Sequence, residues 1–213
     1  AVADFAPVTQ VTSQAYLLGV YPGVPAKSVN DLIALAKAKP GLLNFASGGN
    51  GNATHLGGEL LKDLAGINLV HVPYKGGGPA LVALIAGEVT MLFSNISFTL
   101  PQIKAGKVRA LAVTGAKRSL AAPELPTVAE AGVPGFELTS WYGVLAPAKT
   151  PKAIVASLHT EIVNGLKAAD IKARLANDGN EIVGNAPDEF AAYMAAEIPK
   201  WARVITKSGA NMQ

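Results

Sequence analysis

The segment Phe45-Ala-Ser-Gly-Gly-Asn-Gly-Asn-Ala-Thr-His55 decides the fold class of this chain. It overlaps a short apolar run at 43–46, and helical spacing of apolar residues follows from Ala53 to Leu64. A strand that passes through a glycine-rich turn into a helix is typical of α/β proteins. The first N–H groups of such a helix point outward with partial positive charge, and glycine lets a ligand approach the backbone. The segment therefore predicts a strand–turn–helix unit suited to an anion.

The same turn also fits a purely structural explanation, which is a helix cap with a tight turn. It reads Gly-Gly-Asn-Gly-Asn-Ala, which is not the glycine spacing of a dinucleotide-binding loop. It also lacks the Gly-Lys-Ser/Thr ending of a phosphate-binding P-loop. The sequence thus predicts neither a nucleotide nor any other cofactor.

Short apolar strands alternate with amphipathic helices along the middle of the chain. Strand-like runs lie at 16–21, 43–46, 68–72, 89–93 and 108–113. Ser28-Val-Asn-Asp31 is a capping box that opens a helix closed by Pro40, and another helix is expected at 79–86. The β-α-β-α order over 40–115 predicts a mostly parallel sheet with right-handed crossovers.

The pattern changes in the last third of the chain. Thr127-Val-Ala-Glu130 is a second capping box, which predicts a short helix, and 136–145 reads as a long strand. Helical patterns at 151–177 and 187–207 are separated by a short strand at 180–183. This helix-rich part is expected to belong to a different lobe from the α/β middle.

Composition and charge exclude several classes of protein. The 213 residues are 50% hydrophobic and 15% charged, enough for a sizeable core in one large domain or two modest ones. No apolar run approaches the ~20 residues of a membrane-spanning helix. The absence of cysteine excludes disulfides, thiolate nucleophiles and cysteine metal sites. The net charge is only +3 and the basic residues are scattered, so a small anion is expected as partner rather than a nucleic acid.

Two further segments are predicted to reach the same edge of the sheet as the first turn. Val72-Pro-Tyr-Lys-Gly-Gly-Gly-Pro79 again joins a strand to a helix, and Leu92-Phe-Ser-Asn95 ends the next strand. Open α/β sheets bind ligands at the carboxyl ends of their strands, so the three segments predict one site. The predicted ligand-binding residues are Ser47, Gly48, Asn50, Gly51, Asn52, Thr54, Tyr74, Gly76, Ser94 and Asn95.

Within this site, the N–H groups from Gly48 to Asn52 and the hydroxyls of Ser47 and Thr54 are expected to donate to a carboxylate. Tyr74 fits equally well as a rim residue that packs its ring on a strand. Asn95 fits equally well as the cap of a following helix.

The three histidines do not form a metal-binding pattern, because the sequence contains neither His-x-x-x-His nor His-Glu-x-x-His. His55 is expected to hydrogen-bond the glycine turn and shape it. Ser47 and His55 are conceivable as nucleophile and base, but there is no Gly-x-Ser-x-Gly elbow and no obvious third member. Trp141, in a strand that is expected to connect two lobes, is either a core residue or a ring that faces the space between them.

Four motifs in order resemble one known family. They are Asn44-Phe-Ala-Ser-Gly-Gly-Asn-Gly-Asn-Ala-Thr-His-Leu56, Val70-His-Val-Pro-Tyr-Lys-Gly76, Pro126-Thr-Val-Ala-Glu-Ala-Gly132 and Ser140-Trp-Tyr-Gly-Val-Leu-Ala-Pro147. They resemble the Bug family, the extracytoplasmic solute receptors of tripartite tricarboxylate transporters. The resemblance runs from Asp4 to Ala210.

The resemblance implies a fold and a function. The fold is a type II periplasmic-binding-protein-like α/β fold with two lobes around a cleft, lobe one being incomplete in this chain. Residues 1–13 would cross over from lobe one, 14–138 would form lobe two, and 139–213 would cross back and complete lobe one. The function is a non-catalytic periplasmic receptor that binds an organic carboxylate and hands it to membrane components. The full-length protein is expected to be a monomer, with its export signal outside this chain.

Two departures from the family pattern matter. A stretch that normally precedes Ala1 and contributes a ligand loop is not in the sequence. The second departure is Ser94, because many relatives have Asp at this position. A neutral Ser94 removes a partner for an ammonium group of the ligand. The sequence therefore predicts a carboxylate without an amine, such as a small dicarboxylate or an aromatic acid. The alternatives are a hydrolase-like enzyme acting on an organic acid with Ser47 and His55, and a structural or assembly domain without a ligand.

Overall fold

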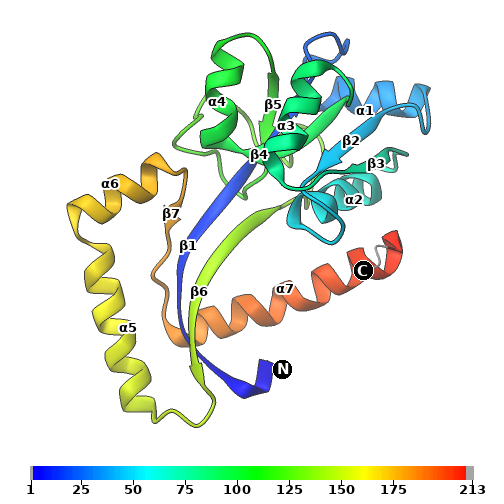
Figure 1. Cartoon of the computed structure of the whole chain (residues 1–213). Helices are drawn as coiled ribbons and strands as arrows, with labels where there is room; N and C mark the ends of the chain where they lie inside the picture. Colours follow the sequence, from blue (N-terminus) through cyan, green and yellow to red (C-terminus); the bar gives the residue numbers. More distant parts are fainter. Residues whose placement is uncertain (1, 210–213) are drawn as a thin grey trace. The chain divides into compact units, whose positions relative to one another are not determined.

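The computed structural model describes residues 2–209. Contacts between Cα atoms divide the chain into two compact units, and each is described by itself. Unit 1 comprises Ala1–Gln14 and Ser140–Ala202, and unit 2 comprises Ala15–Thr139 and Arg203–Gln213. The long strand β1 (Phe5–Val20) begins in unit 1 and ends in unit 2 (Figure 1).

The sheet of unit 2 has the strand order β3-β2-β4-β1-β5. Its other strands are β2 (Asn44–Ser47), β3 (Val70–Pro73), β4 (Met91–Asn95) and β5 (Arg109–Val113). β2 pairs in parallel with β3 and β4, whereas β1 is antiparallel to both β4 and β5. The four strands that the sequence places within 40–115 therefore run in one direction, as predicted. β1, from outside that range, is the antiparallel member.

The helices of unit 2 follow their sequence signals closely. They are α1 (Val29–Ala38), α2 (Ala53–Ala65), α3 (Gly77–Ala86) and α4 (Ile96–Lys104). The predicted capping box at α1 is confirmed, because the Ser28 hydroxyl accepts the Asp31 N–H at 3.1 Å. Gly66 ends α2 in the left-handed conformation (φ 61°), which glycine adopts without steric cost.

The second predicted capping box forms its side-chain bonds but no helix. Thr127 and Glu130 exchange hydrogen bonds of 3.0 Å, yet residues 128–132 form only turns. Gly132 has φ 118°, outside the helical region, and Pro134 follows two residues later. The chain therefore turns before a helix can extend, and the prediction of a short helix here is wrong.

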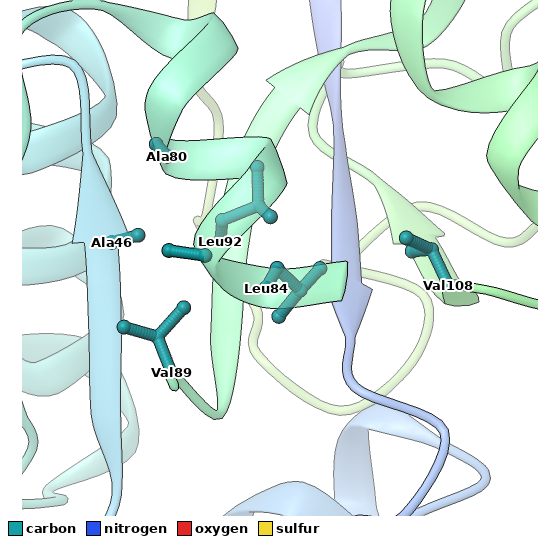
Figure 2. Packing of buried hydrophobic residues seen from close by; sticks show 7 residues of the cluster. Ala46, Ala80, Leu84, Val89, Leu92 and Val108 are labelled. Carbon is teal, nitrogen blue, oxygen red and sulfur yellow. The ribbon is translucent and has the colours of Figure 1, made fainter. Parts of the chain in front are cut away.

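One hydrophobic cluster of unit 2 lies between α3 and the sheet (Figure 2). It consists of Ala46, Ala80, Ala83, Leu84, Val89, Leu92 and Val108. α2 also lies close to the strands, because its Gly57 and Gly58 carry no side chain. A Cβ at Gly58 would stand 2.1 Å from the Phe45 ring, and one at Gly57 would stand 2.3 Å from Leu138. This close approach sets the distance between α2 and the sheet. It therefore also positions the turn at the start of α2.

Unit 1 combines β-strands with three helices. The strands are the first part of β1, β6 (Thr139–Pro147) and β7 (Glu181–Ile182), and β1 pairs with both. A 3-10 turn, η1 (Val2–Asp4), precedes β1, and the helices are α5 (Lys152–Leu166), α6 (Ala169–Asn177) and α7 (Pro187–Ser208). Trp141 meets Phe190 and Tyr193 edge to face, with ring centroids 5.5 and 5.7 Å apart, so its ring packs inside unit 1.

The end of α7, from Arg203, belongs to unit 2. There Val204 is buried and Lys207 forms an ion pair with Asp63 of α2. The family resemblance assigns the whole of 139–213 to lobe one, and this assignment stays a prediction. Among residues 2–209, no helix is long and apolar enough to cross a membrane.

Candidate ligand-binding site

A pocket of about 370 Å³ lies at the edge of the sheet of unit 2 where β2 and β4 end. Three helices, α2, α3 and α4, begin around it. The lining residues are Tyr16, Gly48, Asn52, Thr54, Gly77, Gly78, Leu81, Phe93, Ser94, Asn95 and Phe98. Convergence of several helix N-termini on one pocket creates a region of positive potential without any cationic side chain.

Half of the residues predicted for the site line this pocket. They are Gly48, Asn52, Thr54, Ser94 and Asn95. The other five, which do not line it, are Ser47, Asn50, Gly51, Tyr74 and Gly76. The Tyr74 ring packs against the core beneath α3, and its N–H donates to the Ser47 carbonyl at 3.0 Å.

Sequence reasoning missed a further set of lining residues. Tyr16 carries no local signal, because only the register of β1 with β4 places it opposite Asn95. Phe98 lies in the first turn of α4 and is 70% exposed. Its one sequence signal was its position three residues after Asn95, which puts the two residues on the same face of a helix. Gly77 and Gly78 belong to the glycine turn after β3, but only the start of α3 at Gly77 shows that they form its uncapped first turn.

The turn that joins β2 to α2 satisfies several of its own N–H groups. The Gly48 N–H donates to Thr54 Oγ1 at 3.0 Å, and both the N–H and the hydroxyl of Thr54 donate to Asn52 Oδ1 at 2.6 and 2.7 Å. The Gly49 N–H donates to Ser47 Oγ, and the Gly51 N–H donates to His55 Nδ1, each at 3.1 Å. Several N–H groups that the sequence assigned to a ligand are therefore bonded within the turn in this structure.

The starts of α3 and α4 contrast with that of α2. No side chain caps α3 after Gly76 or α4 after Asn95 within the described part of the chain. A Cβ added at Gly76, Gly77 or Gly78 would meet nothing within 4 Å, so the backbone here faces open space. Asn95 occupies the cap position of α4, but its side chain makes no cap bond. These helix starts can receive an anion from the pocket.

The polar groups of the pocket are neutral. Among its described lining residues there is no Lys, Arg, Asp or Glu. The remaining lining is apolar or aromatic, from Leu81, Phe93 and Phe98, with Tyr16 beside them. The pocket thus combines helix N-termini, hydroxyls and amides with an apolar surface.

Two histidines lie behind the turn. The rings of His55 on α2 and His71 on β3 stack with centroids 3.7 Å apart and planes 7° apart, and Phe45 stacks on His71 at 4.9 Å. Burial lowers the pKa of His55, and nearby Glu59 partly opposes this effect. Burial, with His55 and Lys62, lowers the pKa of His71 to about 4. Both rings are therefore neutral at pH 7.

Ser47 pairs with His71 rather than with His55. Its hydroxyl oxygen lies 2.6 Å from His71 Nε2, and the residue is 1% exposed. A nucleophilic serine needs an exposed hydroxyl that a substrate carbonyl can approach. The hydrolase-like arrangement of Ser47 and His55 is thus not what the structure forms. Within residues 2–209, no three His, Asp or Glu side chains come close enough to hold a metal ion.

Known proteins with the same sequence pattern identify the family. The family model described as "Tripartite tricarboxylate transporter family receptor" matches residues 1–210. The chain belongs to this receptor family. The predicted resemblance to the Bug receptors is thereby confirmed.

Individual members of the receptor family match over almost the whole chain. The UPF0065 protein from the tcbD–tcbE intergenic region of Pseudomonas sp. strain P51 is 37% identical, over 98% of this chain and 62% of its own length. BugT of Bordetella pertussis is 35% identical, over 99% of this chain and 64% of its own length. The chain thus spans less than two thirds of these curated relatives.

A solved member of the family confirms the fold. The structure of R. palustris Rpa4515 with adipate superposes with a TM-score of 0.80 at 39% identity, covering 97% of this chain and 69% of that one. The α/β periplasmic-binding-protein-like fold predicted from the sequence is therefore confirmed.

Proposed function

We propose that this chain binds a small organic carboxylate as the solute receptor of a tripartite transporter. The observation that carries the proposal is the pair of uncapped helix starts, α3 and α4, facing a pocket in a member of this receptor family. Each charge-assisted hydrogen bond from such an N–H to a carboxylate contributes about 1.5–3 kcal/mol. A carboxylate oxygen at the Gly77 and Gly78 amides would therefore be held without a cationic side chain.

The pocket favours a carboxylate that carries no amine. An ammonium group taken from water without a counter-charge costs several kcal/mol. Ser94 stands in the lining, and no acidic side chain is among the described lining residues. An amino acid would therefore leave its ammonium unpaired on this side of the ligand.

An apolar portion of the ligand fits the other wall. Leu81, Phe93 and Phe98 offer carbon surface next to the helix starts. Rpa4515, the relative with adipate, holds a dicarboxylate whose two ends are joined by four methylene groups. Burial of each methylene contributes about 0.8 kcal/mol. We infer a ligand with a carboxylate head and an apolar chain or ring.

The cellular role follows from the family. The receptor would act in the periplasm, bind its ligand without chemical conversion, and deliver it to the membrane components of the transporter. Co-purification of those components with the liganded full-length protein would support this role. Fractionation of the full-length protein into the cytosol would contradict it.

The test of the proposal is a panel of ligands measured by calorimetry and thermal unfolding. Adipate, benzoate, malate, aspartate and glutamate are compared with the chain as it stands and with a longer protein of the length of its relatives. A ligand at a hundredfold excess over its Kd stabilises the fold by about 2.7 kcal/mol. We expect adipate or benzoate to bind most tightly, and no compound to be converted. Tighter binding of aspartate or glutamate by tenfold would contradict the amine-free class, and turnover would contradict a receptor.

A further inference from the structure

The stacked histidines both bond to the turn that joins β2 to α2. His55 occupies the first turn of α2, three residues after the cap residue Asn52, which lines the pocket. His71 belongs to β3 and reaches Ser47, the last residue of β2. The pair therefore contacts Ser47 and Gly51 of the segment Ser47–Asn52, which we call the ligand loop.

The bond from the loop to His55 fixes the protonation of that ring. The Gly51 N–H donates to His55 Nδ1 at 3.1 Å, so Nδ1 must carry a lone pair and the ring proton must sit on Nε2. His55 Nε2 in turn faces Glu59 Oε1 at 3.9 Å. If Nδ1 gained a proton, two N–H groups would face each other and the loop would lose this bond.

The second ring adds a reason why the pair must be neutral. The His55 and His71 rings lie face to face at 3.7 Å, so two positive charges there would repel strongly. The charged groups acting on the pair come from α2, and they are Glu59 and its partner Lys62. From β2, the uncharged Phe45 and Ser47 pack against the pair. Glu59 favours a charge on His55, whereas Lys62 disfavours a charge on either ring.

We propose that His55 and His71 are positioning residues, which hold the ligand loop in its binding shape as a neutral stacked pair, and that the loop is released when His55 is protonated at Nδ1. The relation to affinity rests on the proposed function of the pocket. The relation to loop shape rests only on the bonds of Gly51 and Ser47. Burial lowers the pKa of both rings, so the pair is neutral at pH 7 and takes up protons in acid.

The test follows the loop itself, without a ligand. In the isotopically labelled chain, NMR records the imidazole carbons of both histidines and the Gly51 amide between pH 7.5 and 3.5, with circular dichroism as a measure of global folding. We expect the Gly51 amide to shift and to lose hydrogen-exchange protection with the midpoint of the His55 ring, while the fold is intact. A Gly51 amide that stays unchanged as His55 titrates would overturn the proposal, and so would loss of the bond only with global unfolding.

Two substitutions provide matched controls. In His55→Asn, the amide oxygen takes the place of Nδ1 and accepts the Gly51 N–H without titrating. In His71→Gln, the amide reaches the position of Nε2 beside Ser47. We expect the Gly51 transition to disappear in His55→Asn and to shift toward higher pH in His71→Gln, which removes the neighbouring ring. A transition in His55→Asn identical to that of the wild type would overturn the proposal, whichever way the second variant behaves.

Adipate provides the functional readout. Between pH 7 and 4.5, its Kd should rise at least fivefold more in the wild type than in His55→Asn, and the comparison cancels the titration of adipate itself. Equal increases in both proteins would overturn the link between the pair and affinity. The two proposals can fail separately. If the wild-type protein bound no member of the panel at pH 7 but its Gly51 amide still responded to pH as described, the proposed function would be contradicted and the loop mechanism would be supported.

Discussion

The Gly76 N–H donates a 3.1 Å hydrogen bond to the Gly48 carbonyl oxygen, which joins the two glycine turns that follow β3 and β2. Gly76 holds φ 109°, a conformation that a residue with a side chain rarely adopts. The bond fixes the start of α3 against the turn that precedes α2, so the two helix starts keep a constant spacing. Displacement of one turn should therefore displace the other.

Removal of one N–H at the start of α3 should weaken carboxylate binding. Gly77→Pro deletes that donor, yet proline is favoured at the first helical position, and Gly76, with ψ 169°, lies outside the α region that a following proline disfavours. Loss of a charge-assisted bond predicts an affinity lower by about tenfold or more. Gly77→Ala keeps the N–H and adds a Cβ in open space, so its affinity should stay within about threefold. Calorimetry with adipate compares the two, and equal affinities would move the carboxylate elsewhere.

Phe98 should select ligands by their apolar part. Its side chain is 70% exposed, so Phe98→Ala should change the free energy of unfolding by no more than about 0.5 kcal/mol. Affinity for adipate or benzoate should fall by about three- to tenfold, while affinity for the shorter malate should change less. Leu120→Ala, at an 89% exposed residue outside the pocket lining, is the control. A uniform loss across all ligands would argue against a selective role.

Gly58 and Gly165 should respond in opposite directions to alanine. Both are helical, but a Cβ at Gly58 would press into the Phe45 ring, whereas one at Gly165 would meet nothing within 4 Å. Gly58→Ala should lower the free energy of unfolding by about 1–3 kcal/mol, through strain in a packed interior. Gly165→Ala should raise it by about 0.5–1 kcal/mol, because alanine loses less backbone entropy in a helix. Urea denaturation measures both, and a stable Gly58→Ala would show that α2 can move off the sheet.

The hydroxyl of Thr114 should be needed for the stability of unit 2. It accepts the Tyr16 N–H at 2.7 Å and donates to the Leu138 carbonyl at 2.6 Å, and the residue is fully buried. Thr114→Val keeps the shape but removes both hydrogen bonds of the buried hydroxyl, which costs about 1–3 kcal/mol. Thr160→Val, at an exposed threonine of α5, should cost no more than about 0.5 kcal/mol. Similar urea midpoints for the two variants would contradict this account.

Stability should fall in acid through His71. The ring takes up a proton near pH 6.5 in the unfolded chain and at about pH 4 in the folded protein. Between these values unfolding binds protons, so the free energy of unfolding decreases as the pH is lowered from 6.5 toward 4. Allowing for the partial exposure of the ring, the loss should be on the order of 1–3 kcal/mol. His71→Gln should flatten this part of the profile, measured by urea denaturation at several pH values, and an unchanged slope would exclude His71 as its source.

Local chemistry let the sequence determine much of the fold. The capping box at Ser28, the helix that starts at Ala53 and the glycine turns depend on neighbours within a few residues, so they appear as predicted. The family could also be recognised, because its motifs are continuous stretches of chain. The capping box at Thr127 shows the limit, since its side-chain bonds formed but the following Gly132 and Pro134 prevented a helix.

Only the tertiary structure decided which groups are free to act. The N–H groups of Gly48 and Gly51 looked available in the sequence, but Thr54 and His55 fold back and use them. Strand pairing brought His71 rather than His55 to Ser47, and the antiparallel register of β1 placed Tyr16 at the pocket. The physical reason is that a hydrogen-bond donor has one best acceptor, and long-range packing decides which acceptor reaches it. The sequence therefore determined that a polar turn would meet a helix start, and the fold determined which amides remain for a ligand.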